Sequence, residues 1–262
     1  MRNIRLDLEY DGRNYCGWQC QPNVVTVEAT LKNAVEGIVH HPVTLNSSGR
    51  TDSGVHAEQH VAQFRSETVL PVFNLLRGIN SLLPKDITVY RLLEMPEEWN
   101  ARFDACEREY HYTFYNHPSP SALLRHRTYW VRYPLDIDAM CAAAKYLEGR
   151  HDFTSFRSIN CDAKNPVRTL LEASLRDVKP LIHLRVRGQA FLRHQVRTIA
   201  GTLFHVGMGK MAADSIPDIL AAKDRGQAGP SLPAHALTLV SVRYPGDEEI
   251  LKDIGHRSLF PK

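Results

Sequence analysis

The first residues of the chain alternate apolar with charged side chains and predict a β-strand over residues 4–10. Ile4, Leu6 and Leu8 fall on one face of that strand and the charged residues on the other, which is the two-residue period of a half-buried strand. An amphipathic helix should follow, with Thr26 as its N-cap. Its apolar positions recur at helical spacing, at Val27, Leu31, Ala34, Val35 and Ile38.

Further elements complete the first part of the chain. Short strands are expected at residues 43–45 and 60–64, and the Gly-, Ser- and Asp-rich residues 46–54 form the loop between them. A second helix should begin after Pro71, and another strand is expected at residues 87–92. The apolar positions of that helix are Phe73, Leu76 and Ile79.

The second part of the chain repeats this style. Residues 110–115 predict an aromatic strand, and a helix capped by Asp136 should end at Gly149. Apolar and polar residues alternate over residues 182–186, which predicts a strand. An amphipathic helix should begin at Leu192. The polar face of this last helix would carry Arg193 and Arg197.

The order of these elements predicts an α+β fold in two halves, each a sheet with helices on one face. The N-terminal half would span residues 1–100 and carry the loop of Asp52, and the C-terminal half would span residues 101–262. Residues 95–106 should contain the hinge. No pattern assigns a role to the tail, residues 246–262.

Composition places the chain among soluble proteins. It has 262 residues, 43% of them hydrophobic, and no apolar run approaches the roughly 18 residues of a membrane span. The N-terminus has no signal-peptide pattern, so a cytoplasmic location is expected. Five scattered cysteines indicate reduced thiols. Cys16 and Cys20 could supply two zinc ligands, but no second Cys or His pair lies at a matching spacing.

Charge is unevenly distributed along the chain. The net charge is only +3, but residues 150–197 contain ten basic against four acidic residues. This segment is either an ordinary solvated face or a surface that contacts a polyanion such as an RNA backbone.

The segment SSGRTDSGVHAEQHVAQF, residues 47–64, has the clearest chemical content. Asp52 and Arg50 lie on a loop between Gly49 and Gly54, so a rigid turn would present an acid and a base together. Spacing alone favours a plain hairpin turn made of ordinary turn-forming residues. However, GRTDSGVHA resembles the signature loop of the TruA family of tRNA pseudouridine synthases, in which the Asp is catalytic.

Four other segments resemble motifs of the same family, and all the motifs occur in the expected order along the chain. REYHYTFYNH, residues 108–117, is similar to the strand whose first tyrosine, here Tyr110, contacts the target base. FLRHQVRTIAGTL, residues 191–203, is similar to the motif whose arginine, here Arg197, faces the catalytic Asp. The remaining two are YDGRNYCGWQ, residues 10–19, and HDFTSF, residues 151–156.

The resemblance implies a pseudouridine synthase fold, in which the halves share an extended antiparallel sheet and the active-site cleft lies between them. It implies an isomerase that converts uridines 38, 39 and 40 of the tRNA anticodon stem-loop to pseudouridine, without a metal or a small-molecule cofactor. The protein would be a homodimer with no membrane association. Asp52 and Arg197 would be catalytic, and Tyr110 and Arg50 would bind the substrate.

The residues leave parts of the mechanism open. The Asp52 carboxylate could attack C1′ or C6, or act as a base on the ribose. Tyr110 could stack on the extruded base or also assist proton transfer from C5. An RNA-binding module without turnover is a rival interpretation. A metal-dependent hydrolase is another, because His56 and His60 lie four residues apart, although no further ligand completes the set.

Overall fold

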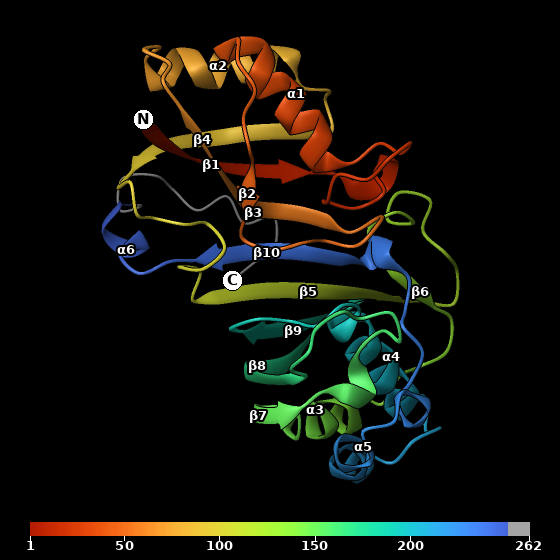
Figure 1. The fold of residues 1–262 in the computed structure, drawn as a ribbon. Helices are drawn as coiled ribbons and strands as arrows, with labels where there is room; N and C mark the ends of the chain where they lie inside the picture. The colour runs from red at the N-terminus through yellow and green to blue at the C-terminus, as the bar shows by residue number, and fades with distance from the viewer. Residues whose placement is uncertain (251–262) are drawn as a thin grey trace. The chain divides into compact units, whose positions relative to one another are not determined.

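The computed structural model describes residues 1–250 and divides into two compact units (Figure 1). Unit 1 contains Met1–Cys106 and the chain from Leu239 onward, and unit 2 contains Glu107–Thr238. The sequence placed one division at residue 100, whereas the structure cuts the chain at Cys106 and again after Thr238. The last strand thus belongs mostly to unit 1, because it pairs with strands that lie far away in sequence. Residues 251–262 of the predicted tail lie outside the described residues.

Unit 1 is built on a sheet in which β1 lies between β4 and β3, and β2 pairs with β3. Its elements are β1 (Arg2–Tyr10), α1 (Val27–Val39), β2 (Asn46–Ser47), β3 (His56–Ser66), α2 (Val72–Leu82), β4 (Ile87–Met95) and α6 (Asp247–Ile250). The strand β10 (Leu237–Arg243) crosses the division between the units. The α1 and α2 helices pack together, and α2 also contacts β4 (Figure 1).

The predicted helices of unit 1 form, with one change of face. Thr26 caps α1 by accepting a hydrogen bond from the backbone N–H of Ala29 at 3.3 Å, as the sequence predicted. In α2, however, Leu75 and Ile79 are buried while Phe73 is 64% exposed. The short strand expected at residues 43–45 begins instead at Asn46.

The strand β1 corrects the expectation of a half-buried strand, because both of its faces are buried. Arg5 and Asp7 on the charged face are fully inaccessible to solvent. Nε of Arg5 donates to Asp7 at 2.7 Å, and its Nη1 reaches Asp247 at 2.5 Å. Arg91 binds the second oxygen of Asp7. Buried ions require such partners, and here the partners come from β4 and from the returning end of the chain.

Unit 2 has a sheet in the order β5-β9-β8-β7, and β6 pairs with β5. Its elements are β5 (Glu107–Asn116), β6 (Tyr129–Val131), α3 (Ile137–Lys145), β7 (Gly149–Asp152), β8 (Val167–Val178), β9 (Leu181–Gly188), α4 (Gln195–Gly207) and α5 (Ile216–Ala222). The α3 helix packs against α4 and β8, as Figure 1 shows. Asp136 caps α3, accepting from Ala139 N–H at 2.9 Å.

The helix that carries Arg197 starts later than expected. The α4 helix begins at Gln195, and the residue before it, His194, has φ of +64°. That left-handed conformation is uncommon for a residue other than glycine, and it prevents the helix from extending back to Arg193. Arg193 is therefore exposed ahead of α4 and does not share a helical face with Arg197.

The buried charges of unit 1 lead to a stability prediction. Asp7→Asn should lower the free energy of unfolding by about 3–5 kcal/mol, because it leaves Arg5 and Arg91 buried with one carboxylate fewer. Urea denaturation monitored by circular dichroism would measure the change. Glu94→Gln is the matched control, since Glu94 pairs with Arg2 at the surface and is 53% exposed. Equal midpoints for the two variants would contradict the importance of the buried cluster.

Candidate active site

Asp52 and Arg50 lie on the loop that joins β2 to β3. The carbonyl of Asp52 accepts a hydrogen bond from Val55 N–H at 3.1 Å, which closes the turn around Ser53 and Gly54. Asp52 is half-buried, and Arg50 is exposed. The loop therefore offers a carboxylate and a guanidinium within three consecutive residues, as the sequence predicted.

Residues 10–18, from the last residue of β1 onward, pack against this loop and form its support, called here the seat of the loop. Backbone N–H of Trp18 donates to the carbonyl of Thr51 at 3.1 Å, and the hydroxyl groups of Tyr10 and Thr51 lie 2.8 Å apart. A Cβ on Gly17 would lie 2.7 Å from the Thr51 carbonyl, and one on Gly12 would lie 2.0 Å from the Val55 carbonyl. Only glycine permits so close an approach of two backbones.

Two histidines of β3 support the same loop. The ring of His60 stacks on Trp18, with centroids 3.8 Å apart, and its Nε2 lies 3.1 Å from the Gly49 carbonyl. Nδ1 of His56 lies 3.2 Å from both Gly12 N and an Asp11 carboxylate oxygen. Across residues 1–250, no three His, Cys, Asp or Glu side chains gather as a metal site would require. These contacts give both histidines a structural role.

Tyr110 lies on β5 of unit 2, opposite Val186 of β9. Its ring meets Phe191 edge to face, with centroids 5.1 Å apart. Such an arrangement favours a fixed ring orientation. This ring contact joins β5 to the segment that leads into α4. The motifs at residues 108–117 and 191–203 therefore meet here.

Arg197 is held by the segment 229–232, which lies against α4. Nε of Arg197 donates to the Leu232 carbonyl at 2.8 Å, and Leu232 N–H donates back to the Arg197 carbonyl at 3.2 Å. The Thr198 and Ser231 hydroxyls are 2.8 Å apart. A Cβ on Gly201 would lie 1.7 Å from the Pro230 carbonyl. The guanidinium group is thus fixed at its Nε edge.

The structure places the four predicted residues in two pairs. Asp52 and Arg50 share one loop of unit 1, and Tyr110 and Arg197 both belong to unit 2. Sequence reasoning missed the segment 229–232. Its signal was the Gly229-Pro230 pair, which reads as a loop but gives no indication of the helix it contacts.

Two arginines of the basic segment 150–197 are held in internal ion pairs. Nε of Arg185 lies 2.8 Å from Glu109, Nε of Arg187 lies 3.0 Å from Glu107, and both arginines also reach Glu172. Burial alone would raise the pKa of Glu109, but hydrogen bonds from His111 and Arg185 lower it to about 2. The carboxylate therefore stays ionised, and these two arginines are poor candidates for RNA contact.

Comparisons with known proteins agree with the motifs. A family described as tRNA pseudouridine synthase matches residues 143–245. The tRNA pseudouridine synthase A of Burkholderia lata is 43% identical over 244 residues, which cover 93% of this chain and 90% of that protein. The protein of the same name from Acetivibrio thermocellus is also 43% identical over 244 residues, covering 93% and 100% of the two chains.

Among solved structures, an archaeal box H/ACA sRNP Nop10-Cbf5 complex aligns with 79% of this chain and 43% of its own. The identity is 12% and the TM-score 0.35. We draw no conclusion from so remote a likeness.

The close approach at Gly17 leads to a prediction about the loop. Gly17→Ala should lower the free energy of unfolding by roughly 1–3 kcal/mol, because Gly17 has φ of +86° and its Cβ would press on Thr51. Gly49→Ala, on the Asp52 loop itself, is the control, since a Cβ there meets nothing within 4 Å. Urea denaturation of both variants would measure the effect. If Gly17→Ala were as stable as Gly49→Ala, the seat of the loop would not depend on this glycine.

Proposed function

Since this chain belongs to the tRNA pseudouridine synthase A family and converts uridine to pseudouridine in tRNA, we propose that Asp52 is its catalytic carboxylate. The substrate would be the anticodon stem-loop, at uridines 38, 39 and 40. The observation that supports this assignment is the built seat of the Asp52 loop, in which Tyr10, Gly12, Gly17 and Trp18 all touch residues 51–55. A plain surface turn would need no such support.

The chemistry is an isomerisation with no net oxidation or reduction. The N1–C1′ bond breaks, the uracil rotates, C5 bonds to C1′, and the proton of C5 leaves while N1 gains one. All atoms are conserved, so the residues of the chain can carry the reaction without a cofactor. Asp52 acts in its ionised form, by attack at C1′ or C6 or as a base on the ribose.

Arg197 would keep that carboxylate ionised and oriented. A nearby guanidinium favours the charged form of an acid, whereas exclusion of water disfavours it. Because Nε of Arg197 already donates to the Leu232 carbonyl, the ion pair with Asp52 would be end-on, through Nη1 and Nη2.

Tyr110 and Arg50 would bind the extruded nucleotide. A uridine in a stem or loop must leave its stack to be reached, and an aromatic ring can replace the lost stacking. The edge-to-face contact with Phe191 holds the Tyr110 ring ready for this role. Arg50 is exposed two residues before Asp52, where its charge would contact a phosphate of the same nucleotide.

The working form would be a cytoplasmic homodimer, by the resemblance stated for the motifs. Among the described residues, no helix has the length and apolarity to cross a bilayer.

Asp52→Asn should abolish isomerisation and leave tRNA affinity nearly unchanged. Many phosphate contacts determine affinity, while one carboxylate carries the reaction. Tritium release from tRNA labelled with [5-³H]uridine would measure turnover, and filter binding would measure affinity. Turnover should fall by more than about 100-fold, the low end of what a positioned acid or base contributes.

Asp162→Asn serves as the control for this experiment. Asp162 is an exposed acid of unit 2 outside the site, so its variant should retain both turnover and binding. Turnover of the Asp52 variant within about tenfold of wild type would reject the catalytic assignment. Absence of turnover in the wild-type protein itself, with tRNA still bound, would favour the binding module.

Arg197→Leu should move the acid limb of the pH–rate profile to higher pH. A guanidinium favours the charged form of a carboxylate beside it, so the variant should need a higher pH to reach the same rate. Arg197→Lys should have a smaller effect, because it keeps the charge but loses the planar fork and the Nε bond to Leu232. Single-turnover rates between pH 5 and 8 would reveal the shift.

Arg193→Leu is the matched control. Arg193 is exposed, precedes α4, and donates to the Asn160 carbonyl at 3.3 Å, so its loss should alter tRNA affinity alone. An acid limb that stays in place in Arg197→Leu, at near-wild-type turnover, would refute the ion pair with Asp52.

A further inference from the structure

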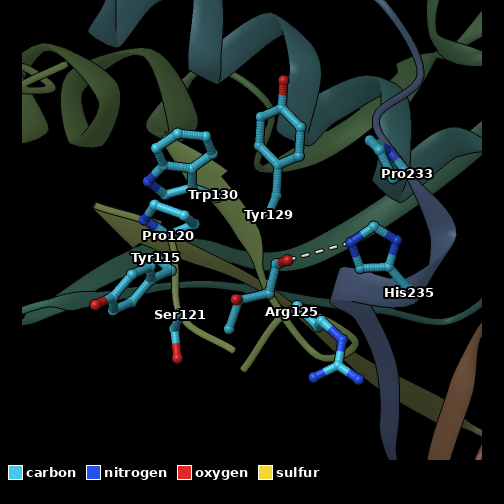
Figure 2. A pocket seen from close by; sticks show the side chains of 9 residues that line it. Tyr115, Pro120, Ser121, Arg125, Tyr129, Trp130, Pro233 and His235 are labelled. Carbon is cyan, nitrogen blue, oxygen red and sulfur yellow. Dashed lines mark hydrogen bonds between the residues drawn. The ribbon is translucent and has the colours of Figure 1, made fainter. Parts of the chain in front are cut away.

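A pocket lies within unit 2, at the end of β5 and along β6 (Figure 2). Its volume is about 310 Å³. Its walls combine aromatic rings with a few polar groups, from Tyr115, Pro120, Ser121, Arg125, Thr128, Tyr129, Trp130, Pro233 and His235. Nothing described above assigns a role to it.

The rings of this pocket are held in fixed orientations. Nε1 of Trp130 donates to the His117 carbonyl at 2.8 Å, and the ring is 42% exposed. Tyr129 meets Phe204 of α4 edge to face at 5.6 Å. His235 bonds the Thr128 carbonyl at 3.2 Å, the contact drawn in Figure 2. Trp130 is therefore a held, accessible ring surface, and Tyr129 also lines the pocket.

The chain around the pocket is basic. No Asp or Glu occurs between Tyr110 and Leu135, whereas Arg125, Arg127 and Arg132 do, and all three arginines are exposed. In contrast to Arg185 and Arg187, Arg125 lines the pocket itself (Figure 2). An exposed arginine beside an accessible aromatic ring is a combination that binds single-stranded nucleotides.

The pocket is connected to Arg197 through a short stretch of chain. Pro233 and His235 line the pocket, and the neighbouring Leu232 carbonyl holds Nε of Arg197. The Pro233 carbonyl also accepts a hydrogen bond from the Tyr112 hydroxyl at 3.0 Å. Burial raises the pKa of Tyr112 far above its usual value, so this hydroxyl remains a donor. A ligand bound in the pocket would therefore contact Pro233 and His235, which closely follow Leu232, the residue that positions Arg197.

We propose that this pocket binds an unpaired nucleobase of the tRNA, distinct from the uridine that reacts. The base stacks on Trp130 beside Tyr115, and its phosphate contacts Arg125. Ser121, Thr128 and His235 supply hydrogen-bonding groups for the edge of the base. The volume is near the lower end of small-ligand pockets, roughly 300–1,000 Å³, and suits one base with its ribose. The proposal rests on tRNA being the substrate.

Abasic substitution in the RNA, combined with substitution of Trp130, tests the proposal. Each unpaired nucleotide of a tRNA substrate is replaced in turn by an abasic one, and dissociation constants are measured with Asp52→Asn protein and with Asp52→Asn/Trp130→Ala protein. One abasic position should weaken binding to the first protein about 5- to 100-fold, the range for loss of one base–aromatic stack. The same position should have no effect on the second protein.

Two variants make the result specific. Trp130→Phe keeps an aromatic face and should retain most of the coupling, while Tyr133→Ala removes an exposed ring outside the pocket and should leave the coupling intact. Arg125→Gln should reduce the slope of log K against log salt by about one. Thermal unfolding of each variant would confirm that the fold is retained.

Other outcomes would overturn the proposal. Equal losses at every RNA position, or abasic effects that persist in Trp130→Ala protein, would mean that no base stacks there. A change in oligomeric state of Trp130→Ala at unchanged tRNA affinity would assign the pocket to a protein contact. Failure of the Asp52→Asn protein to bind any tRNA would instead contradict the substrate itself.

Discussion

The Asp52 loop owes its position to the close approach of two backbone segments that only glycine allows. The loop has little regular structure of its own, so its geometry depends on the residues beneath it. Gly12 and Gly17 bring the opening turn against residues 51–55, and Trp18 continues the contact by stacking on His60. The pairing of β1 with β3 places these segments side by side, since Tyr10 lies opposite Ala57. A loop mounted in this way loses little freedom when a substrate binds, as the proposed catalytic role of Asp52 would require.

Unit 2 supports Arg197 by the same physical means. The segment 229–232 contacts α4 so closely that Gly201 has no room for a side chain, and reciprocal hydrogen bonds join Arg197 to Leu232. Both residues of the proposed ion pair therefore lie on segments that are held by close backbone contacts at glycines. Such contacts tolerate little displacement, because a shift of one backbone immediately meets the other.

Basic residues that form ion pairs with carboxylates are less suited to contact RNA than exposed ones. Arg5 and Arg91 are buried with Asp7, and Arg185 and Arg187 are paired with glutamates of β5 and β8. Their charges stabilise the two sheets and are already balanced. Arg125, Arg127 and Arg132 come from a stretch without acidic residues and remain exposed. A count of charges along the sequence drew attention to residues 150–197, whereas the exposed arginines that lack acidic neighbours in sequence lie within residues 110–135.

The sequence by itself determined the α+β class, most of the strands and helices, the Thr26 and Asp136 caps, and the motifs that identify the family. These features depend on local periodicity, capping chemistry and short segments, all of which can be read from neighbouring residues. Only the tertiary structure decided that both faces of β1 are buried, that the last strand joins unit 1, and that segment 229–232 holds Arg197. Each of these depends on partners distant in the chain, such as Arg5 and Asp247, 242 positions apart. Local periodicity records which side chains share a face of an element, but it carries no information on what will cover that face.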